Sequence, residues 1–517
     1  MPIRMVEDPH EEKPRSNIPS GKKGGSGGMA TSFLPLIIGL FRKNPKTGML
    51  LVGAGIVLWF LFGKGCDTSQ IVSNLFNTGA NFDPQKYDNV EVFEPLSDNV
   101  NAPLPERVSL EKYAPARMNQ GAQGSCVGWG SSYAARTILE SVKTGKEPNS
   151  IAFSPSYLYN QIGIEGCQGA LLQDAMQVMK NEGLISMKQF PYDETDCTRQ
   201  PSGNLKQEAQ NYKVPGFNRL TQGDAKGFGS EEVDMLAMKQ NLAQGAPVVI
   251  GMMVGGSFMQ NMMGEEKWFP TSNDYDMYGF GGHCMTVIGY DDYKFGTEGG
   301  FQLMNSWGPE WGKNGLGWVS YRDFAYFTKE AYGIYPMGNP NKPLSNTLNV
   351  QFGLMNNETS KNIPLQKTGT YTFATKSPVK KLTKFKLQVT NTMECYTYIF
   401  GQETDGSSYV LFPYTEKHSP YCGITGTRLF PKDYSMQVDE VGTKDNMAIV
   451  VSKQPLDYKT LNTLINSKTG TYEQKLAAAL QGKQVKNVNF LPGETISFQA
   501  DAKENECVMM VIEVSKN

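Results

Sequence analysis

The chain has 517 residues, which at roughly 100–200 residues per domain allows about three to four folded units. Apolar residues make up 39% and aromatic residues 11%, which excludes wholesale disorder, and 8 cysteines in this length exclude a disulfide-dense scaffold. The 49 basic residues are balanced by 51 acidic ones, so there is no global positive field and we expect no nucleic acid partner.

The N-terminal region has the pattern of a membrane anchor. Residues 1–46 begin with a stretch rich in Lys, Pro, Ser and Gly, which predicts a flexible cytoplasmic tail and a juxtamembrane segment. Residues 47–63, TGMLLVGAGIVLWFLFG, carry no charge and match the short end of the roughly 17–25 residues that a transmembrane helix needs. Basic residues precede this run and acidic residues follow it. We therefore expect one pass through the cytoplasmic (inner) membrane, with the rest of the chain extracytoplasmic.

Three alternatives remain open for this apolar run. It could be a buried globular helix, a cleaved signal peptide, or part of a lipid attachment site at Cys66. Residues 64–103 lack hydrophobic periodicity and contain several Asp, Asn and Pro, which predicts a linker between the apolar run and a folded domain.

The first segment with chemical character is QGAQGSCVGWGSSYAARTILESVKTG, which begins at Gln120. A Gly-Ser turn leads into helix-forming residues that end at Gly145, so Cys126 is predicted at or near a helix N-terminus. There the unpaired backbone N–H groups and the helix dipole favour the thiolate, which is the nucleophilic form of cysteine. A lone cysteine is more often a small buried apolar residue, so Cys126 needs a base before it indicates catalysis.

Only three histidines could serve as that base. His10 lies in the predicted tail and His418 in a region of different composition, which leaves His283, in GFGGHCMTVIGYDD before a predicted strand. Asn305 follows the apolar run FQLM and could accept a hydrogen bond from the imidazole, which would fix its tautomer. Trp307 could cover that hydrogen bond from water.

Together these segments resemble the papain-like (C1-type) cysteine peptidases of bacterial type over residues 104–336. Gln120 stands six residues before Cys126, where the family has its oxyanion-hole glutamine, and Asn305 opens an Asn-Ser-Trp-Gly box. The resemblance implies an α+β domain with a helical lobe and a β-barrel lobe, and no metal or other cofactor. It also implies that Cys126 is the nucleophile, His283 the base and later the acid, Asn305 the orienting group and Gln120 an oxyanion donor.

The same resemblance implies a set of substrate-binding residues along the cleft: Gly169, Ala170, Gly282, Cys284 and Trp307. Gln123 stands where better-known members carry a cysteine, so Cys167 lacks its usual partner and either pairs with Cys197 or remains a thiol. No long charged helical segment precedes Leu104, so the folded propeptide of the family is not expected. Five methionines between residues 252 and 263 favour a flexible, adaptable loop, with a mobile lid as the alternative.

Residues 346–517 change character. Short alternating runs separated by Gly, Asn and Asp turns predict an antiparallel β-sandwich, with one helical insertion around residues 472–480. The region resembles a bacterial β-sandwich domain of unassigned function, which implies an accessory role and a possible protein or glycan partner. His418 and Cys422 have the spacing of half a metal site, but no second ligand pair is near, so we expect a turn there.

The leading hypothesis is a membrane-anchored cysteine endopeptidase that acts on a peptide or protein substrate. A catalytically silent scaffold that binds a protein partner is the first alternative, although a binding module has no need of all four catalytic residues. A transglutaminase or peptide ligase would use the same acyl-enzyme, but transglutaminases normally have Asp in the position of Asn305.

Overall fold

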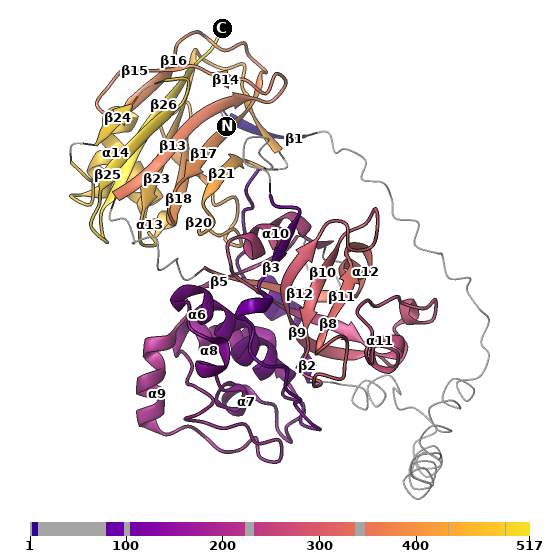
Figure 1. Ribbon diagram of the computed structural model, residues 1–517. Helices are drawn as coiled ribbons and strands as arrows, with labels where there is room; N and C mark the ends of the chain where they lie inside the picture. Colours follow the sequence, from indigo (N-terminus) through magenta and orange to yellow (C-terminus); the bar gives the residue numbers. More distant parts are fainter. Residues whose placement is uncertain are drawn as a thin grey trace, which may run out of the picture. The chain divides into compact units, whose positions relative to one another are not determined.

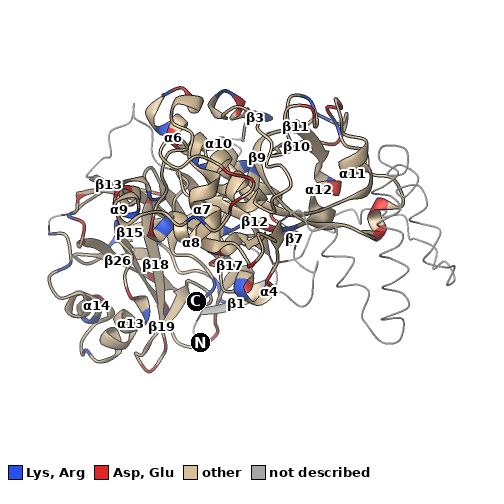
Figure 2. Ribbon diagram, turned by 90° about the horizontal axis from the view of Figure 1, so that it is seen from below, with Lys and Arg blue, Asp and Glu red and all other residues tan. Residues whose placement is uncertain are grey.

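The computed structural model describes residues 3–8, 79–97, 104–222, 232–336, 347–432, 434–486, 488–491 and 493–517. The predicted transmembrane run at 47–63 lies outside these ranges, as do residues 9–46 of the predicted tail. Among the helices of the described ranges, none has both the length and the apolar character that a membrane crossing requires. Acidic and basic residues are interspersed along the elements (Figure 2).

One lobe of the N-terminal domain is helical. Its main elements are α5 (Cys126–Gly128), which continues through a wider helical segment (Trp129–Arg136) into α6 (Thr137–Thr144), and α7 (Pro155–Ile162), α8 (Leu172–Asn181) and α9 (Gly203–Ala209). The side chains of Ser154 and Ser202 cap α7 and α9, and Gly145 ends α6 with φ +68°. The helix predicted between Cys126 and Gly145 is therefore confirmed at both ends.

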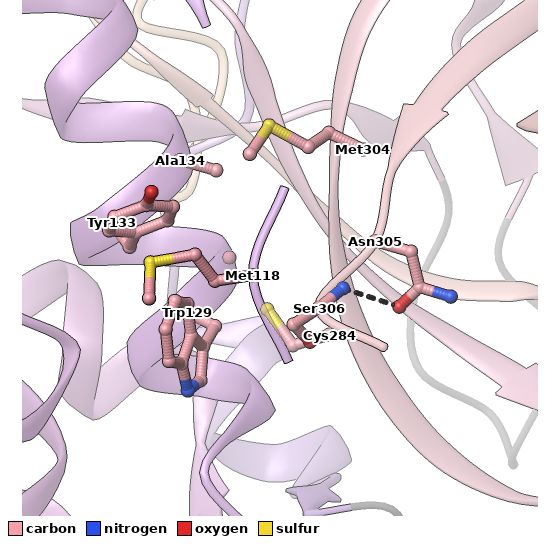
Figure 3. A pocket seen from close by; sticks show the side chains of 9 residues that line it. Met118, Trp129, Tyr133, Ala134, Cys284, Met304, Asn305 and Ser306 are labelled. Atoms are coloured by element: carbon pink, nitrogen blue, oxygen red, sulfur yellow. Dashed lines mark hydrogen bonds between the residues drawn. The ribbon is translucent and has the colours of Figure 1, made fainter. Parts of the chain in front are cut away.

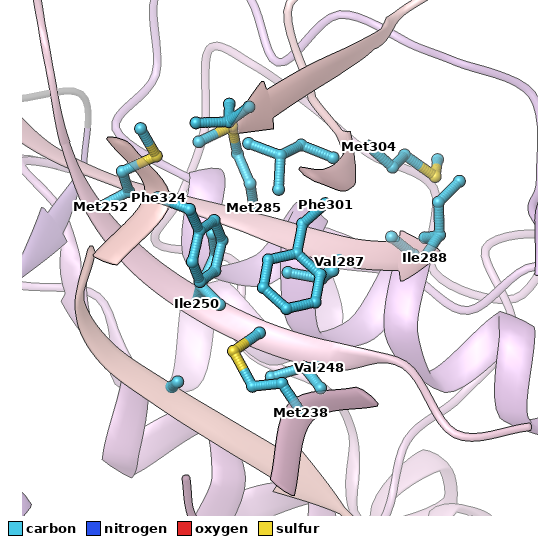
Figure 4. Packing of buried hydrophobic residues seen from close by; sticks show 14 of the residues in the cluster. Met238, Val248, Ile250, Met252, Met285, Val287, Ile288, Phe301, Met304 and Phe324 are labelled. Carbon is cyan, nitrogen blue, oxygen red and sulfur yellow. The ribbon is translucent and has the colours of Figure 1, made fainter. Parts of the chain in front are cut away.

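The other lobe is built on a seven-stranded antiparallel sheet, in the order β11-β10-β9-β8-β12-β5 with β3 beside β9 (Figure 1). Its strands are β3 (Arg107–Ser109), β5 (Phe217–Arg219), β8 (Val248–Val254), β9 (Gly281–Asp291), β10 (Gly300–Met304), β11 (Leu316–Ser320) and β12 (Thr328–Ile334). Helices α10 (Met235–Ala243), α11 (Gly256–Gln260) and α12 (Tyr321–Phe327) accompany it. Buried side chains such as Ile250, Met285 and Phe301 pack together on this sheet (Figure 4).

The methionines do not form a loop of their own. Met252 and Met253 belong to β8 and Met259 to α11. Met252 and Met262 are buried in the apolar core, whereas Met263 is exposed. The expected flexible loop is thus largely a strand and a short helix, because alternate residues of β8 find apolar neighbours in the core.

The C-terminal domain consists of two sheets that share one apolar core. The first contains β13 (Thr347–Asn356), β14 (Asn362–Ile363), β17 (Lys384–Asn391), β21 (Gly426–Phe430), β22 (Tyr434–Val438), β24 (Asn489–Leu491) and β25 (Ile496–Asp501). The second contains β15 (Leu365–Lys367), β16 (Thr372–Thr375), β18 (Cys395–Gln402), β19 (Ser408–Phe412), β20 (Tyr421–Cys422), β23 (Lys444–Ser452) and β26 (Cys507–Ser515).

Two helices lie against the second sheet. They are α13 (Tyr458–Asn466) and α14 (Tyr472–Leu480), and their apolar residues Leu461 and Leu476 join a buried cluster with Tyr398 of β18. The predicted helical insertion is confirmed as α14, whereas α13 is not among the predicted elements. The pairing differs from the expected purely antiparallel one at β16 and β26, which run parallel.

The first described residues differ from the flexible tail that we expected. Residues Ile3–Glu7 form β1, which pairs antiparallel with β22, and the Asp8 carboxylate lies 2.6 Å from the buried ammonium of Lys386. An edge strand offers unpaired N–H and C=O groups to any extended segment. A buried ammonium also needs a negatively charged partner, and Asp8 supplies it.

Part of the predicted linker is also ordered. Residues 79–97, which we call the strap, contain β2 (Ala80–Asn81) and α4 (Pro84–Asp88), and β2 pairs in parallel with β4 (Ala170–Leu171). Tyr87 and Phe93 of the strap are buried, and Tyr87 packs edge-on against Tyr332. The sequence predicts a linker here because the few apolar side chains of the strap show no period. They are held by the surfaces of other elements instead.

Separately from the strap, β6 (Thr221–Gln222) and β7 (Glu232–Val233) pair antiparallel in a small two-stranded sheet.

Candidate active site

Cys126 is the first residue of α5 and is completely buried. The backbone N–H of Cys284 donates a hydrogen bond to its Sγ at 3.4 Å, which joins the helical lobe to strand β9 of the sheet lobe. Burial raises the pKa of the thiol to about 12, against the lowering effect of backbone N–H groups at the helix start. The predicted position at a helix N-terminus is confirmed, and burial there disfavours the thiolate.

His283 lies next to that contact, on β9. Its Nε2 and the Oδ1 of Asn305 are 2.7 Å apart, and Oδ1 also accepts from the backbone N–H of Ser306 at 2.7 Å. With Oδ1 as the acceptor, Nε2 must carry the proton. Among the described residues the buried Nδ1 has no hydrogen-bond partner, which leaves it as the nitrogen that could take a proton from a thiol.

Trp307 stacks on the imidazole of His283. The two ring centroids are 4.3 Å apart and the planes meet at 22°. The histidine is completely buried, and this burial lowers its pKa to about 4, although the hydrogen bond with Asn305 acts in the opposite direction. Burial thus shifts both pKa values in the direction of the neutral forms, the thiol of Cys126 and the uncharged imidazole of His283.

Hydrogen bonds hold Gln120 in the loop before Cys126. Its Oε1 accepts from the hydroxyl of Ser306 at 2.6 Å, its Nε2 donates to the carbonyl of Gln123 at 2.9 Å, and its backbone N–H donates to the carbonyl of Ser306. The side chain thus connects the loop before Cys126 with the segment that carries Asn305. The structure brings together all four predicted catalytic residues, and their chemical roles remain predictions.

Three of the predicted substrate-binding residues, Gly169, Ala170 and Gly282, contact other residues of the chain itself. The carbonyl of Gly79 accepts a hydrogen bond from the backbone N–H of Ala170 at 2.9 Å. The side chain of Asn81 lies against Gly169, where an added Cβ would be 2.4 Å from its Nδ2. A Cβ at Gly282 would lie 2.0 Å from the carbonyl oxygen of Ala80. These three positions are therefore occupied by residues 79–81 in the present structure.

Cys284 has a different environment from the one that we expected. Its thiol is buried and packs against the backbone of Gly130, where an added Cβ would be 2.7 Å from Sγ. It lines a small pocket between the helix that starts at Cys126 and strands β9 and β10, together with side chains such as Trp129 and Met304 (Figure 3). Cys284 thus lies behind the cleft, because the side chains of consecutive strand residues point to opposite faces.

The structure answers the question that the sequence left open for Cys167. Cys167 and Cys197 form a disulfide with their Cα atoms 5.9 Å apart. Gln123, at the position where the family carries a cysteine, instead donates from its amide to the carbonyls of Asp193 and Glu194.

His418 and Cys422 have separate hydrogen-bond partners. Nδ1 of His418 is 3.0 Å from the hydroxyl of Thr415, and the Cys422 thiol points to Thr397. Throughout the described ranges, no group of three or more His, Cys, Asp or Glu side chains is arranged to hold a metal ion.

Sequence reasoning missed the residues that fill the cleft. Gly79, Ala80, Asn81 and Phe82 carry no motif, and a tetrapeptide is too short to show periodicity. The positive φ of Gly79, +113°, and its close approach to Gly124 are visible only once the fold is known.

Comparisons with known proteins agree with this geometry. Residues 105–334 match the family described as "Papain family cysteine protease", and residues 380–455 match a domain of unknown function, DUF4384. Cathepsin L2 of Homo sapiens is 28% identical over 250 residues, which are 45% of this chain and 65% of that protein. Cathepsin B-like CP2 of Giardia intestinalis is 24% identical over 204 residues, 39% of this chain and 62% of that protein.

The chain thus spans somewhat less than two thirds of the length of these two relatives. Among solved structures, xylellain, a cysteine protease from Xylella fastidiosa, is similar at 25% identity, with 50% of this chain and 95% of that chain covered and a TM-score of 0.40. On the family match and the assembled Cys, His, Asn and Gln side chains, residues 105–334 form a papain-family cysteine protease domain.

Proposed function

We propose that this protein is a cysteine endopeptidase that hydrolyses peptide bonds through an acyl-enzyme on Cys126. The observation that carries the proposal is the arrangement of His283: Asn305 holds Nε2, Trp307 stacks on the ring, and the next residue along β9, Cys284, donates its N–H to the Cys126 thiol. A thiol at a helix N-terminus with an oriented imidazole is the minimum that thiol acyl transfer requires.

In the proposed reaction, Nδ1 of His283 takes the proton of the Cys126 thiol as Sγ attacks the substrate carbonyl carbon. A C–S bond forms, the C–N bond breaks, and the imidazolium gives its proton to the leaving amine. Water then attacks the thioester, with His283 as the base, and releases the acid and the free thiol. Gln120 is proposed to donate a hydrogen bond to the developing oxyanion after its amide leaves the carbonyl of Gln123.

The test is covalent labelling of the full chain with a thiol-reactive peptidyl epoxide, followed by mass mapping and a peptide-hydrolysis assay. We expect the label on Cys126 and its loss in His283→Ala. Labelling that is unchanged in His283→Ala, or a folded Cys126→Ala variant that retains hydrolysis, would overturn the proposal. Stoichiometric binding of a protein by an unreactive chain would favour the scaffold alternative, and amine incorporation in place of hydrolysis would favour the ligase.

We further propose that residues 47–63 anchor the protein in the cytoplasmic membrane, with the protease domain extracytoplasmic. The support is the uncharged run and the charge asymmetry of its flanks. Deletion of residues 47–63 should move the protein from the membrane fraction to the soluble fraction.

The pairing of β1 with β22 makes the proposed topology testable. A single crossing at 47–63 would put residues 3–8 and the C-terminal domain on opposite sides of the membrane, where they could not pair within one chain. Met5 and Met436 are opposite each other in the register. Cysteines introduced at both positions should cross-link within one chain if the pairing forms in cells, which would contradict a single crossing. They should remain unlinked if the single-pass proposal is correct.

A further inference from the structure

The N-terminal end of the strap, residues 79–82, lies in the catalytic cleft, and we call it the leading end. The backbone of Gly79 approaches Gly124 so closely that an added Cβ would be 2.1 Å from the carbonyl oxygen of Gly124. The ring of Phe82 lies over Gly251, where a Cβ would be 2.4 Å from the ring, and over Gly282 of the same sheet. Gly124 belongs to the segment before Cys126, whereas Gly251 and Gly282 belong to the sheet lobe. The four residues from Gly79 to Phe82 therefore bridge the two lobes.

This end of the strap lies where a substrate would have to bind. Gly169, Ala170 and Gly282, which the family resemblance assigned to the substrate, contact residues 79–81 instead. Ala80 is 2% exposed, and Cys126 and His283 are both 0% exposed. A substrate carbonyl could not reach the thiol without displacement of these residues.

The C-terminal end of the strap, residues 88–97, is held by the C-terminal domain, and we call it the trailing end. Both backbone groups of Val92 form hydrogen bonds with the turn that carries His418. Its N–H donates to the carbonyl of Lys417, and its carbonyl accepts from the N–H of Ser419. Farther along, the N–H of Ser97 donates to the carbonyl of Thr427 at 2.8 Å. The guanidinium of Arg428, which is 0% exposed, donates to the carbonyl of Glu94 at 3.1 Å.

The protease domain holds the opposite side of the same segment. Backbone bonds join Glu91 and Phe93 to Arg219 of β5, and the amide of Gln240 bonds both the N–H and the carbonyl of Leu96. The carboxylate of Asp88 forms ion pairs with both Arg219 and Lys417. The trailing end is thus clamped between the two domains.

We propose that the C-terminal domain is a latch that keeps the strap in place and so holds the protease latent, and this inference rests on the function proposed above. The surface formed by Lys417, Ser419, Thr427 and Arg428 is an intramolecular docking surface, and residues 88–97 are its occupant. Release of the C-terminal domain from this segment frees the strap, and residues 79–82 leave the cleft. A domain of unknown function thereby acquires a role, which is to control access to Cys126.

Two substitutions test the two ends of the strap one at a time. Gly79→Ala puts a Cβ into contact with Gly124 and imposes φ +113° on an L-residue, which should expel the leading end. Its control is Gly145→Ala, which has φ +68° but no atom within 4 Å of the added Cβ. Lys417→Glu places two carboxylates against each other at the trailing end, by a change in the C-terminal domain alone. Its control is Glu513→Lys, which reverses one charge of the ion pair with Lys444 in the same domain.

Two measurements on the full chain follow each variant. The first is the rate at which the peptidyl epoxide labels Cys126, and the second is the hydrogen–deuterium exchange of the Ala170 amide, which donates to Gly79. Loss of one or two hydrogen bonds that hold the closed state should raise both rates by about tenfold in Gly79→Ala and Lys417→Glu. Both control variants should match the parent chain.

The decisive result is the response of the cleft to Lys417→Glu. If Ala170 exchanges at the parent rate in folded Lys417→Glu, the C-terminal domain is no latch and the inference is wrong. If the parent chain labels as fast as Gly79→Ala, the strap does not block the thiol, although the peptidase function stands. If Ala170 exchange rises but Cys126 never labels, the latch stands and the proposed catalytic function fails. Should Lys417→Glu not fold, Asp88→Lys makes the same test from the strap.

Discussion

The cleft and the interior of the C-terminal domain both bury cysteines, but they do so in different ways. Cys126 starts a helix and accepts a hydrogen bond from Cys284, the residue after His283, and residues 79–82, which are far from it in the sequence, contact Gly124 and Gly282. Cys395 and Cys422 are paired across β18 and β20 and are enclosed between the two sheets, with Arg428 as the charged neighbour.

The pKa values of these thiols run opposite to their expected reactivity. A hydrogen bond from Cys395 lowers the pKa of Cys422 to about 6, whereas burial raises that of Cys126 to about 12. Nucleophilic attack also needs access and a base. Cys422 lacks access, because it is buried in the core between the two sheets. The comparison teaches that burial alone does not set the pKa of a thiol, because both thiols are buried and at Cys422 the hydrogen bond from Cys395 outweighs the effect of burial.

The largest effect is expected on peptide hydrolysis when the Cys126 thiol is removed. Cys126→Ala should lower peptide hydrolysis by at least about 10⁴-fold, because loss of a catalytic nucleophile typically costs that much or more. Hydrolysis of a fluorogenic peptide by the folded variant measures it. The matched control is Cys284→Ala, which removes the neighbouring buried thiol. Residual hydrolysis above about one per cent in Cys126→Ala would assign the nucleophile to another residue.

A smaller effect is expected at Gln120. Gln120→Ala should lower kcat by about 10²–10³-fold, the usual cost of one oxyanion donor, with less effect on epoxide labelling of Cys126. Parallel measurement of both rates in one preparation tests this split. Equal losses in turnover and labelling would instead indicate that Gln120 acts by positioning the loop, since it also bonds Ser306 and Gln123.

The pH dependence of the free energy of unfolding tests whether His283 is buried in solution. The pKa of His283 is lowered to about 4 by burial, from about 6.5 in an unfolded chain, so the unfolded state binds the proton more tightly. The neutral ring therefore stabilises the fold above about pH 6.5. That stability should be lost as the pH falls toward about 4, with a limiting slope of about 1.4 kcal/mol per pH unit.

Chemical denaturation at several pH values checks this slope. His283→Gln keeps a neutral polar side chain and should flatten the pH dependence between about 4 and about 6.5 relative to the parent chain. Identical curves for both proteins would mean that the ring is hydrated and that the cleft is open in solution.

The smallest effect is expected in the C-terminal domain. Cys422→Ala removes a buried sulfur and its hydrogen bonds, which should lower the free energy of unfolding by about 1–2 kcal/mol. Denaturant titration measures that loss, while the rate of Cys126 labelling should stay within about twofold of the parent. Labelling of Cys422 by the epoxide in the parent chain would show that the sheets do not enclose it.

Residues that act through local chemistry were predictable from the sequence. The helix that starts at Cys126 is an example. The Gly-Ser turn predicts its start and Gly145 its end, and both signals depend only on the local conformation of the backbone. His283 followed from the scarcity of histidines, and Asn305 from the strand before it and the aromatic residue after it. In the C-terminal domain β25 follows its alternating pattern in the same way, whereas β23 and β26 are buried at almost every residue.

Only the tertiary structure decided what surrounds those residues. The side to which Cys284 points, the disulfide of Cys167 with Cys197, and the place of Gly79 in the cleft depend on surfaces brought together from distant parts of the chain. Short extended segments such as β1 and the strap carry little local signal, because their N–H and C=O groups are paired by other elements. The sequence alone determined which groups could react, and the tertiary structure decided whether a substrate can reach them, because access depends on packing between segments that are remote in the chain.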